Sequence, residues 1–125
     1  SSSNVVLSNS NDDTILIYIR SPKVSDAVKA ALAEVIKRRQ AISEVVAERN
    51  RLEQQISVID REQNRIRQNM AQLQRTSDLY NRYVKKFGEQ EDQVETLRGQ
   101  IADLVKREGD LRKSLDQYLV GLNVE

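Results

Sequence analysis

The sequence predicts a mainly α fold, in which a long antiparallel two-helix coiled-coil hairpin is preceded by a short N-terminal β-hairpin. Two heptad repeats, each running for about fifty residues, alternate steps of three and four between their seam positions. A short segment rich in helix-capping residues separates the two repeats. Two apolar runs near the N-terminus, divided by small polar residues, are typical of two strands and a turn.

Each repeat places one narrow, mostly apolar seam on its helix, and such a seam is buried by another helix of the same kind. The seam of the first repeat consists of Val28, Ala31, Val35, Arg38, Ile42, Val45, Arg49, Leu52, Ile56, Ile59, Gln63, Ile66, Met70 and Leu73. The seam of the second consists of Tyr80, Tyr83, Phe87, Gln90, Val94, Leu97, Ile101, Leu104, Glu108, Leu111, Leu115, Tyr118 and Leu122.

Residues 1–20 form the predicted β-hairpin, with strands at Val5–Leu7 and Thr14–Ile19 and a turn at Ser8–Asp13. The second strand is rich in β-branched residues and is apolar on both faces. Such a strand is usually buried on both faces by other parts of the protein. Either the base of the helical hairpin covers one face of this strand, or residues 1–20 are the severed end of a larger β-domain whose remainder is missing here. The chain begins Ser1–Asn4 with no Met, which fits a segment of a longer protein.

Residues 21–125 form the predicted helical hairpin, with one helix over about 22–73, a tip over about 74–79 and a second helix over about 80–120. Pro22 suits a first helical turn and Ser21 can cap it, although Ser25–Asp26 offers a second start. Thr76–Asp78 supplies three good caps for the second helix.

The position of the tip sets the register in which the two seams meet. The predicted layers pair Ile66 with Phe87, Ile59 with Val94, Ile56 with Leu97, Leu52 with Ile101, and Ile42 with Leu111. Gln63 and Gln90 fall in one layer, where each amide can satisfy the other. A slip of one heptad would instead bring Arg38 opposite Glu108.

The composition disfavours several classes of function. The 20 basic and 19 acidic residues nearly cancel, whereas nucleic-acid and polybasic membrane binders carry a basic surplus. Cys and His do not occur, and no constellation of catalytic residues is recognisable, so we expect no enzyme, no metal site and no cofactor. No apolar run approaches the roughly eighteen residues that a membrane span needs.

Tyr80, Tyr83 and Phe87 form an aromatic stripe near the tip and are the candidate interaction residues. They could grip a partner or pack the last layers before the turn. The basic run Lys37–Arg39 could contact phosphate, but neighbouring glutamates favour an exposed face of mixed charge.

Arg49 and Glu108 are charged residues that lie within the seams. They could mark a partner site, but polar residues in a seam more often set the register.

Four stretches carry a resemblance to a known family: 7–15, 24–32, 77–87 with Gln90–Glu91, and 118–125. They resemble the C-terminal region of a family of bacterial proteins in which a β-rich domain of unknown function precedes a coiled-coil hairpin. Some members of that family are described as mucoidy inhibitors. The resemblance spans nearly the whole chain from Val5 and implies the C-terminal part of a larger bacterial protein. The family has no known activity, so the resemblance transfers neither an activity nor functional residues to this chain.

The function that these observations favour is a structural and protein-interaction module, a rigid coiled-coil arm of a larger protein. The alternative is a nucleic-acid-binding arm, like the helical hairpin of seryl-tRNA synthetases, against which the balanced charge argues. A tip that carries acidic residues to a polymerase metal, as in transcript-cleavage factors, would need paired carboxylates, but the tip offers only Asp78.

Self-association is also predicted, and a homo-oligomer is the expected form. Leu32, Val46 and Val84 widen the seam beyond what one partner helix covers. The predicted strand at 14–19 would add an edge that can pair with another copy.

Overall fold

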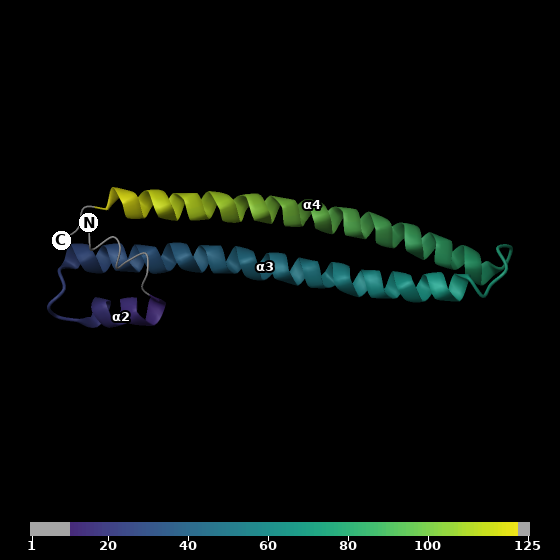
Figure 1. Ribbon diagram of the computed structural model, residues 1–125, viewed down its shortest axis with the longest axis horizontal. Coiled ribbons are helices and arrows are strands. Elements are labelled where there is room, and N and C mark those ends of the chain that lie inside the picture. Colours follow the sequence, from purple (N-terminus) through teal and green to yellow (C-terminus); the bar gives the residue numbers. More distant parts are fainter. Residues whose placement is uncertain (1–10, 123–125) are drawn as a thin grey trace. The chain divides into compact units, whose positions relative to one another are not determined.

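The computed structural model describes residues 11–122, which form three helices and no strand: α2 (Asp12–Arg20), α3 (Asp26–Met70) and α4 (Asp78–Gly121) (Figure 1). The mainly α class is confirmed. The chain divides into two compact units, each described by itself. Among the described residues, unit 1 comprises those up to Val46 and those from Lys106 onward, and unit 2 comprises Ala47–Val105.

The predicted β-hairpin is wrong, because the segment expected to be its second strand lies in helix α2. The Asn11 side chain accepts a hydrogen bond from the Thr14 backbone N–H at 2.8 Å, and Asp12 and Asp13 occupy the first turn. The polar residues interpreted as a turn are therefore partly an N-cap and a helix start that suits acidic side chains. The predicted strand at 5–7 lies outside the described residues.

The two longer helices each begin at a capping serine. The Ser25 hydroxyl accepts from the Val28 N–H at 3.2 Å at the start of α3, and the Ser77 hydroxyl accepts from the Tyr80 N–H at 3.1 Å at the start of α4. Each bond satisfies one of the N–H groups that a first turn leaves unpaired. Helix α3 ends three residues before the predicted Leu73, and α4 begins two residues before the predicted Tyr80.

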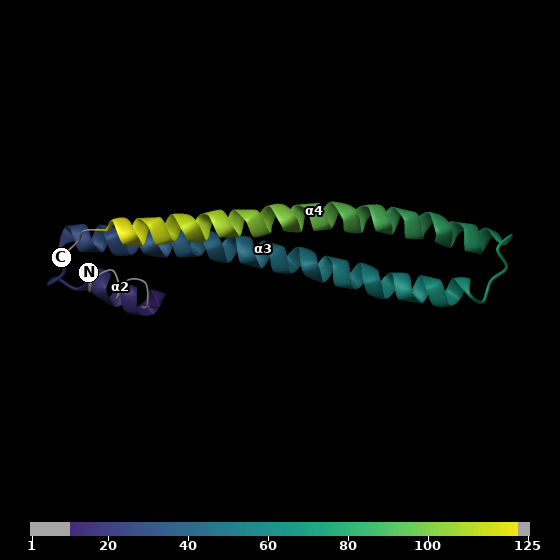
Figure 2. The ribbon, with the colours of Figure 1, turned by 45° about the horizontal axis from the view of Figure 1, so that its top comes forward.

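The core of unit 1 joins all three helices. Ile15 of α2, Leu32 and Val35 of α3, and Leu119 of α4 form one buried cluster. Figures 1 and 2 both draw α2 beside the first turns of α3. Leu32, which the sequence places beside the seam, is covered by this cluster, so α2 takes over part of the role expected of a second copy.

The core of unit 2 is a two-helix seam. Leu52 and Ile59 of α3 are buried against Val94 and Leu97 of α4, and partly buried Ile56, Ile101 and Leu104 pack on this cluster. Ile66 is fully buried nearer the tip. Ile56 is only half-buried, whereas Leu97, its partner in the predicted layer, is buried.

Polar contacts fix the register separately in each unit. In unit 1, Arg38 Nη1 donates to Ser114 Oγ at 2.6 Å, so Arg38 lies close to Ser114 and the one-heptad slip is excluded there. In unit 2, Asn69 Nδ2 donates to Tyr83 Oη at 3.1 Å. Both contacts agree with the register that the position of the tip predicts.

Candidate interaction site

The three aromatic residues predicted as an interaction site lie on the seam side of α4 in unit 2. Each is half-buried. The Tyr83 hydroxyl accepts the hydrogen bond from Asn69, and the Arg67 guanidinium stands over the Phe87 ring, 5.0 Å from its centroid. Such cation–π contacts stabilise by about 0.5–1 kcal/mol at exposed sites. Two of the three rings are therefore engaged by α3, which matches the packing alternative.

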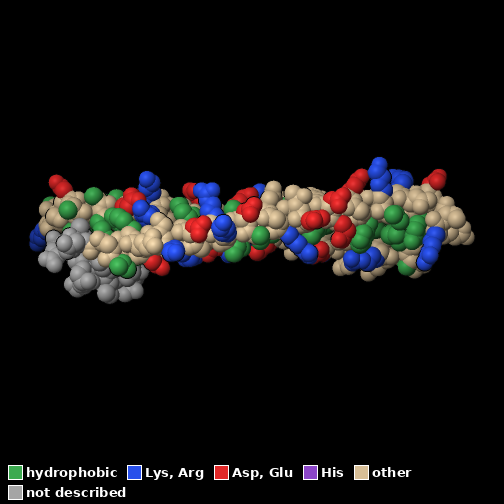
Figure 3. Space-filling model, turned by 90° about the horizontal axis from the view of Figure 1, so that it is seen from above, with side chains coloured by type: hydrophobic (Ala, Val, Ile, Leu, Met, Phe, Trp, Pro, Cys, Tyr) green, Lys and Arg blue, Asp and Glu red, His purple; other side chains and the backbone are tan. Residues whose placement is uncertain are grey.

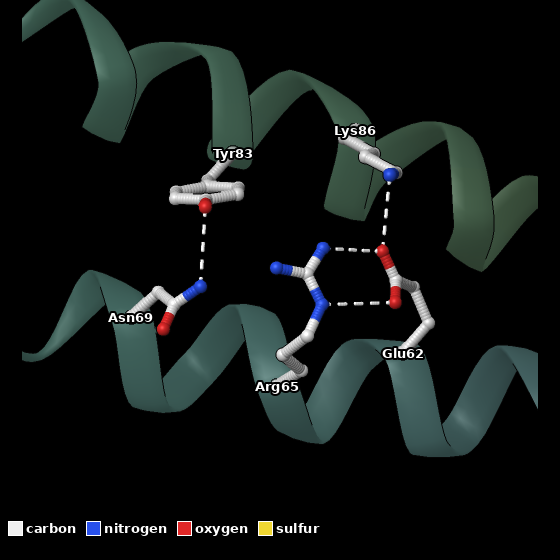
Figure 4. A network of polar contacts seen from close by, with 5 residues as sticks. All are labelled: Glu62, Arg65, Asn69, Tyr83 and Lys86. Carbon is white, nitrogen blue, oxygen red and sulfur yellow. Dashed lines mark hydrogen bonds and ion pairs between the residues drawn. The ribbon is translucent and has the colours of Figure 1, made fainter.

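A network of polar contacts between α3 and α4 lies beside the Tyr83 ring (Figure 4). Glu62 accepts from Arg65 Nε at 3.0 Å on its own helix and from Lys86 Nζ at 3.0 Å on α4. These two hydrogen bonds lower the pKa of the Glu62 carboxyl to about 2, and the bond from Arg65 has the larger effect. The same contact with Glu62, helped by Tyr83, raises the pKa of Arg65. The network ties α3 to α4, and the Glu62 carboxylate within it stays ionised across the physiological range.

The two buried amides of the seam do not pair as expected. Gln63 Nε2 donates instead to Glu91 Oε1 at 2.9 Å, and among the described residues Gln90 Oε1 has no hydrogen-bond partner. Both glutamines are nevertheless buried in unit 2. The amide prediction was wrong because Glu91, the next residue along α4, supplies a charged and therefore stronger acceptor.

In unit 1 both arginines of the basic run Lys37–Arg39 contact other side chains of the protein, so these two cations are less available to bind phosphate. Arg38 Nε donates to Glu34 at 2.9 Å, and its guanidinium lies over the Tyr118 ring at 4.8 Å. Arg39 forms an ion pair with Asp12 of α2, 3.3 Å between Nη1 and Oδ1. Burial, and secondarily the charge of Glu34, raises the pKa of Tyr118. Most of the positive charge in the run is therefore matched by a carboxylate.

The charged residues of the seams also have acidic or basic neighbours. Arg49 Nε lies 3.9 Å from Glu53 Oε1 in unit 2, and Glu108 accepts from Arg112 Nε at 2.8 Å in unit 1. Figure 3 shows the same intermixing of Lys and Arg with Asp and Glu on the face it draws. Each of these two seam charges therefore has a partner of opposite charge on its own helix.

The contacts of Glu62, Arg65 and Lys86 were missed by the sequence analysis. The available signal was the spacing Glu-x-x-Arg, which occurs at 48–51 and again at 62–65. Residues three apart lie on the same face of a helix and can form an ion pair.

Within residues 11–122, no three His, Cys, Asp or Glu side chains are grouped so that they could hold a metal ion. None of the helices in this range is both long and apolar enough to cross a membrane. Comparison of the chain with protein-family models, curated proteins and solved structures gives no match.

Proposed function

We propose that this chain is a structural and protein-interaction module, the coiled-coil arm of a larger bacterial protein. The resemblance of four stretches to the C-terminal region of a bacterial family supports the bacterial origin and the larger protein. The paired heptad seams support a structural role, because their burial holds long helices together.

The outward face of α2 is the observation that carries the interaction role. Leu16, Ile17 and Tyr18 are consecutive, and Ile17 is 70% exposed while the neighbouring Leu16 and Tyr18 are 38% and 45% exposed. Helix α2 has only nine residues, so it places a large share of its apolar side chains in contact with water. Clustered exposed apolar residues favour a protein-binding surface more than single scattered ones do.

A photo-crosslinking amino acid at Ile17 tests this role in cells that make the full protein. The matched control carries the same amino acid at the exposed Gln68 of α3. We expect an adduct of defined mass at position 17 that nuclease leaves intact. A nuclease-sensitive adduct, or the same pattern at both positions, would contradict the proposal.

The nucleic-acid alternative is tested by a mobility-shift assay with RNA over a range of salt concentrations. Phosphate binding would give a shift that weakens steeply as salt rises. We expect no salt-sensitive shift, because the net charge is only +1 and ion pairs occupy many of the cations.

A further inference from the structure

Unit 2 carries a strip of side chains along one flank of α3 that repeats over three heptads. The strip, here called the Val58 strip, consists of Glu48, Arg51, Gln55, Val58, Glu62 and Arg65. Open grooves run along the same flank between α3 and α4 and share lining residues, since Val58 lines two of them and Arg51 also lines two. The strip is therefore a continuous, accessible surface of about 25 Å, at 1.5 Å per residue.

The centre of the strip has little charge. Val58 is 56% exposed, and the groove around it is lined by the amides of Gln54, Gln55 and Gln93. Ion pairs border this centre on both sides: Arg51 binds Glu48, with 2.9 Å between Nε and Oε2, and Arg65 binds Glu62. An exposed valine between two charged clusters fits a small apolar contact whose orientation is set by the charges.

The grooves at the two ends of the Val58 strip have opposite charge. Near the first end, Glu48 and Asp103 outnumber Arg51. Near the second end, Arg65 and Lys86 both contact Glu62 (Figure 4). Arg61 lines the same groove, so basic residues outnumber acidic residues there. A surface with one acidic and one basic end is complementary to a copy of itself turned end to end, and it repels a copy in the same direction.

The order of residues along the strip has the same property. Arg51 and Glu62 lie at equal sequence separations on either side of the midpoint between Gln55 and Val58. Glu48 and Arg65 are placed symmetrically about the same midpoint. A two-fold axis through that midpoint, perpendicular to α3, therefore places each carboxylate opposite a guanidinium of the second copy. A two-fold contact uses one self-complementary patch on both subunits, as this arrangement requires.

We propose that a second copy of this chain docks antiparallel on the Val58 strip, with Arg51 facing Glu62 of the second copy and Val58 packed near Gln55 of that copy. This inference rests on the proposed interaction function and names one partner for it. The exposed apolar area at the centre is small, and exposed ion pairs contribute little. The contact is therefore weak, and the charges select its direction and register.

Charge reversal in the full chain tests both the surface and the direction of docking. Arg51→Glu and Glu62→Arg each place like charges opposite each other in the dimer, so each variant alone should dimerise about tenfold more weakly or worse. Mixed together, the two variants should form a dimer again, because Glu at 51 then faces Arg at 62 and Arg51 faces Glu62. Sedimentation equilibrium from micromolar to millimolar protein gives the dissociation constants.

Arg98→Glu and Glu95→Arg are matched controls on exposed positions of α4 outside the strip, and they should leave dimerisation unchanged. Circular dichroism must give equal helix content for all variants, which separates loss of docking from loss of folding. A chain that stays monomeric at millimolar concentration, single variants that dimerise like the parent chain, or a mixture that fails to recover would overturn the inference. A monomeric chain that still gives a protein adduct at position 17 would overturn only the second-copy partner and leave the proposed function standing.

Discussion

At the scale of single residues, burial distinguishes the side chains that stabilise unit 2 from those that contribute little to its stability. Ile66 is fully buried on α3, whereas Gln68, two residues later, is exposed. Removing buried methyl and methylene groups costs their transfer free energy and leaves a cavity. In a two-helix seam, few other apolar contacts can compensate for such a loss.

We expect Ile66→Ala to lower the free energy of unfolding by about 2–5 kcal/mol. Gln68→Ala should change it by less than about 0.5 kcal/mol, because no buried group is lost. Urea denaturation followed by circular dichroism measures both values. Equal effects of the two substitutions would mean that the seam of α3 lies on another face.

The second residue-scale prediction concerns Glu62, whose pKa is lowered from an ordinary 4.5 to about 2 by Arg65 and Lys86. A lowered pKa in the folded state means that these contacts stabilise the fold at pH values above the ordinary pKa. Their contribution is lost as the pH falls through about 2. High salt should weaken it, because Glu62 and its partners are solvent-accessible.

NMR titration of the glutamate side-chain carbons tests this assignment. Arg65→Gln should raise the pKa of Glu62 toward its ordinary value, because it removes the strongest of the lowering contacts. Arg98→Gln, a like substitution of an exposed arginine on α4, should leave that pKa unchanged. A Glu62 that titrates normally in the parent chain would contradict the network in Figure 4.

At the scale of elements, the caps define where each helix starts, and the glycines reduce the stability of α4. Gly88, Gly99 and Gly109 all lie within α4, and a Cβ added at any of them would meet no atom within 4 Å. None has a positive φ, so the backbone accepts a side chain without strain. Glycine in a helix interior costs about 1 kcal/mol relative to alanine.

Gly99→Ala should therefore raise the free energy of unfolding by about 0.5–1 kcal/mol. The reverse change at a nearby exposed position, Ala102→Gly, should lower it by a similar amount. Thermal and urea denaturation of the two variants provide the comparison. A destabilised Gly99→Ala variant would indicate that position 99 contacts something that the described residues do not include.

At the scale of the whole molecule, α2 distinguishes unit 1 from a plain two-helix seam. It contributes Ile15, which is fully buried, and the ion pair from Asp12 to Arg39. Burying a side chain such as isoleucine contributes about 1.5–3 kcal/mol. Helices this short are marginal in water by themselves, so α2 depends on this packing for its structure.

Ile15→Ala should therefore release α2 from unit 1, and Ile17→Ala on the exposed side should not. Amide hydrogen exchange over residues 15–20 measures the difference, with faster exchange expected only for Ile15→Ala. The two positions have the same residue type on the same helix, so intrinsic helix propensity is matched. Equal exchange in both variants would contradict the docking of α2 through Ile15.

The sequence by itself determined the features that depend on periodicity and capping. The heptad spacing predicted two long helices, because its period repeats over many residues. The cap-rich segment that includes Ser77 predicted a break between them, because capping depends only on residues near the helix end. The aromatic stripe of the candidate site was also visible, since its residues occupy seam positions of the second repeat.

Only the tertiary structure decided whether Thr14–Ile19 is strand or helix. Preferences of β-branched residues are weak, and in so short a segment burial outweighs them. Ile15 and Ile19 are four residues apart, and as a helix they both pack on the cluster that includes Leu32. The contacts of Gln63 with Glu91 and of Glu62 with Lys86 were likewise undecided by spacing, because several long polar side chains can reach the same partner and only three-dimensional geometry selects among them.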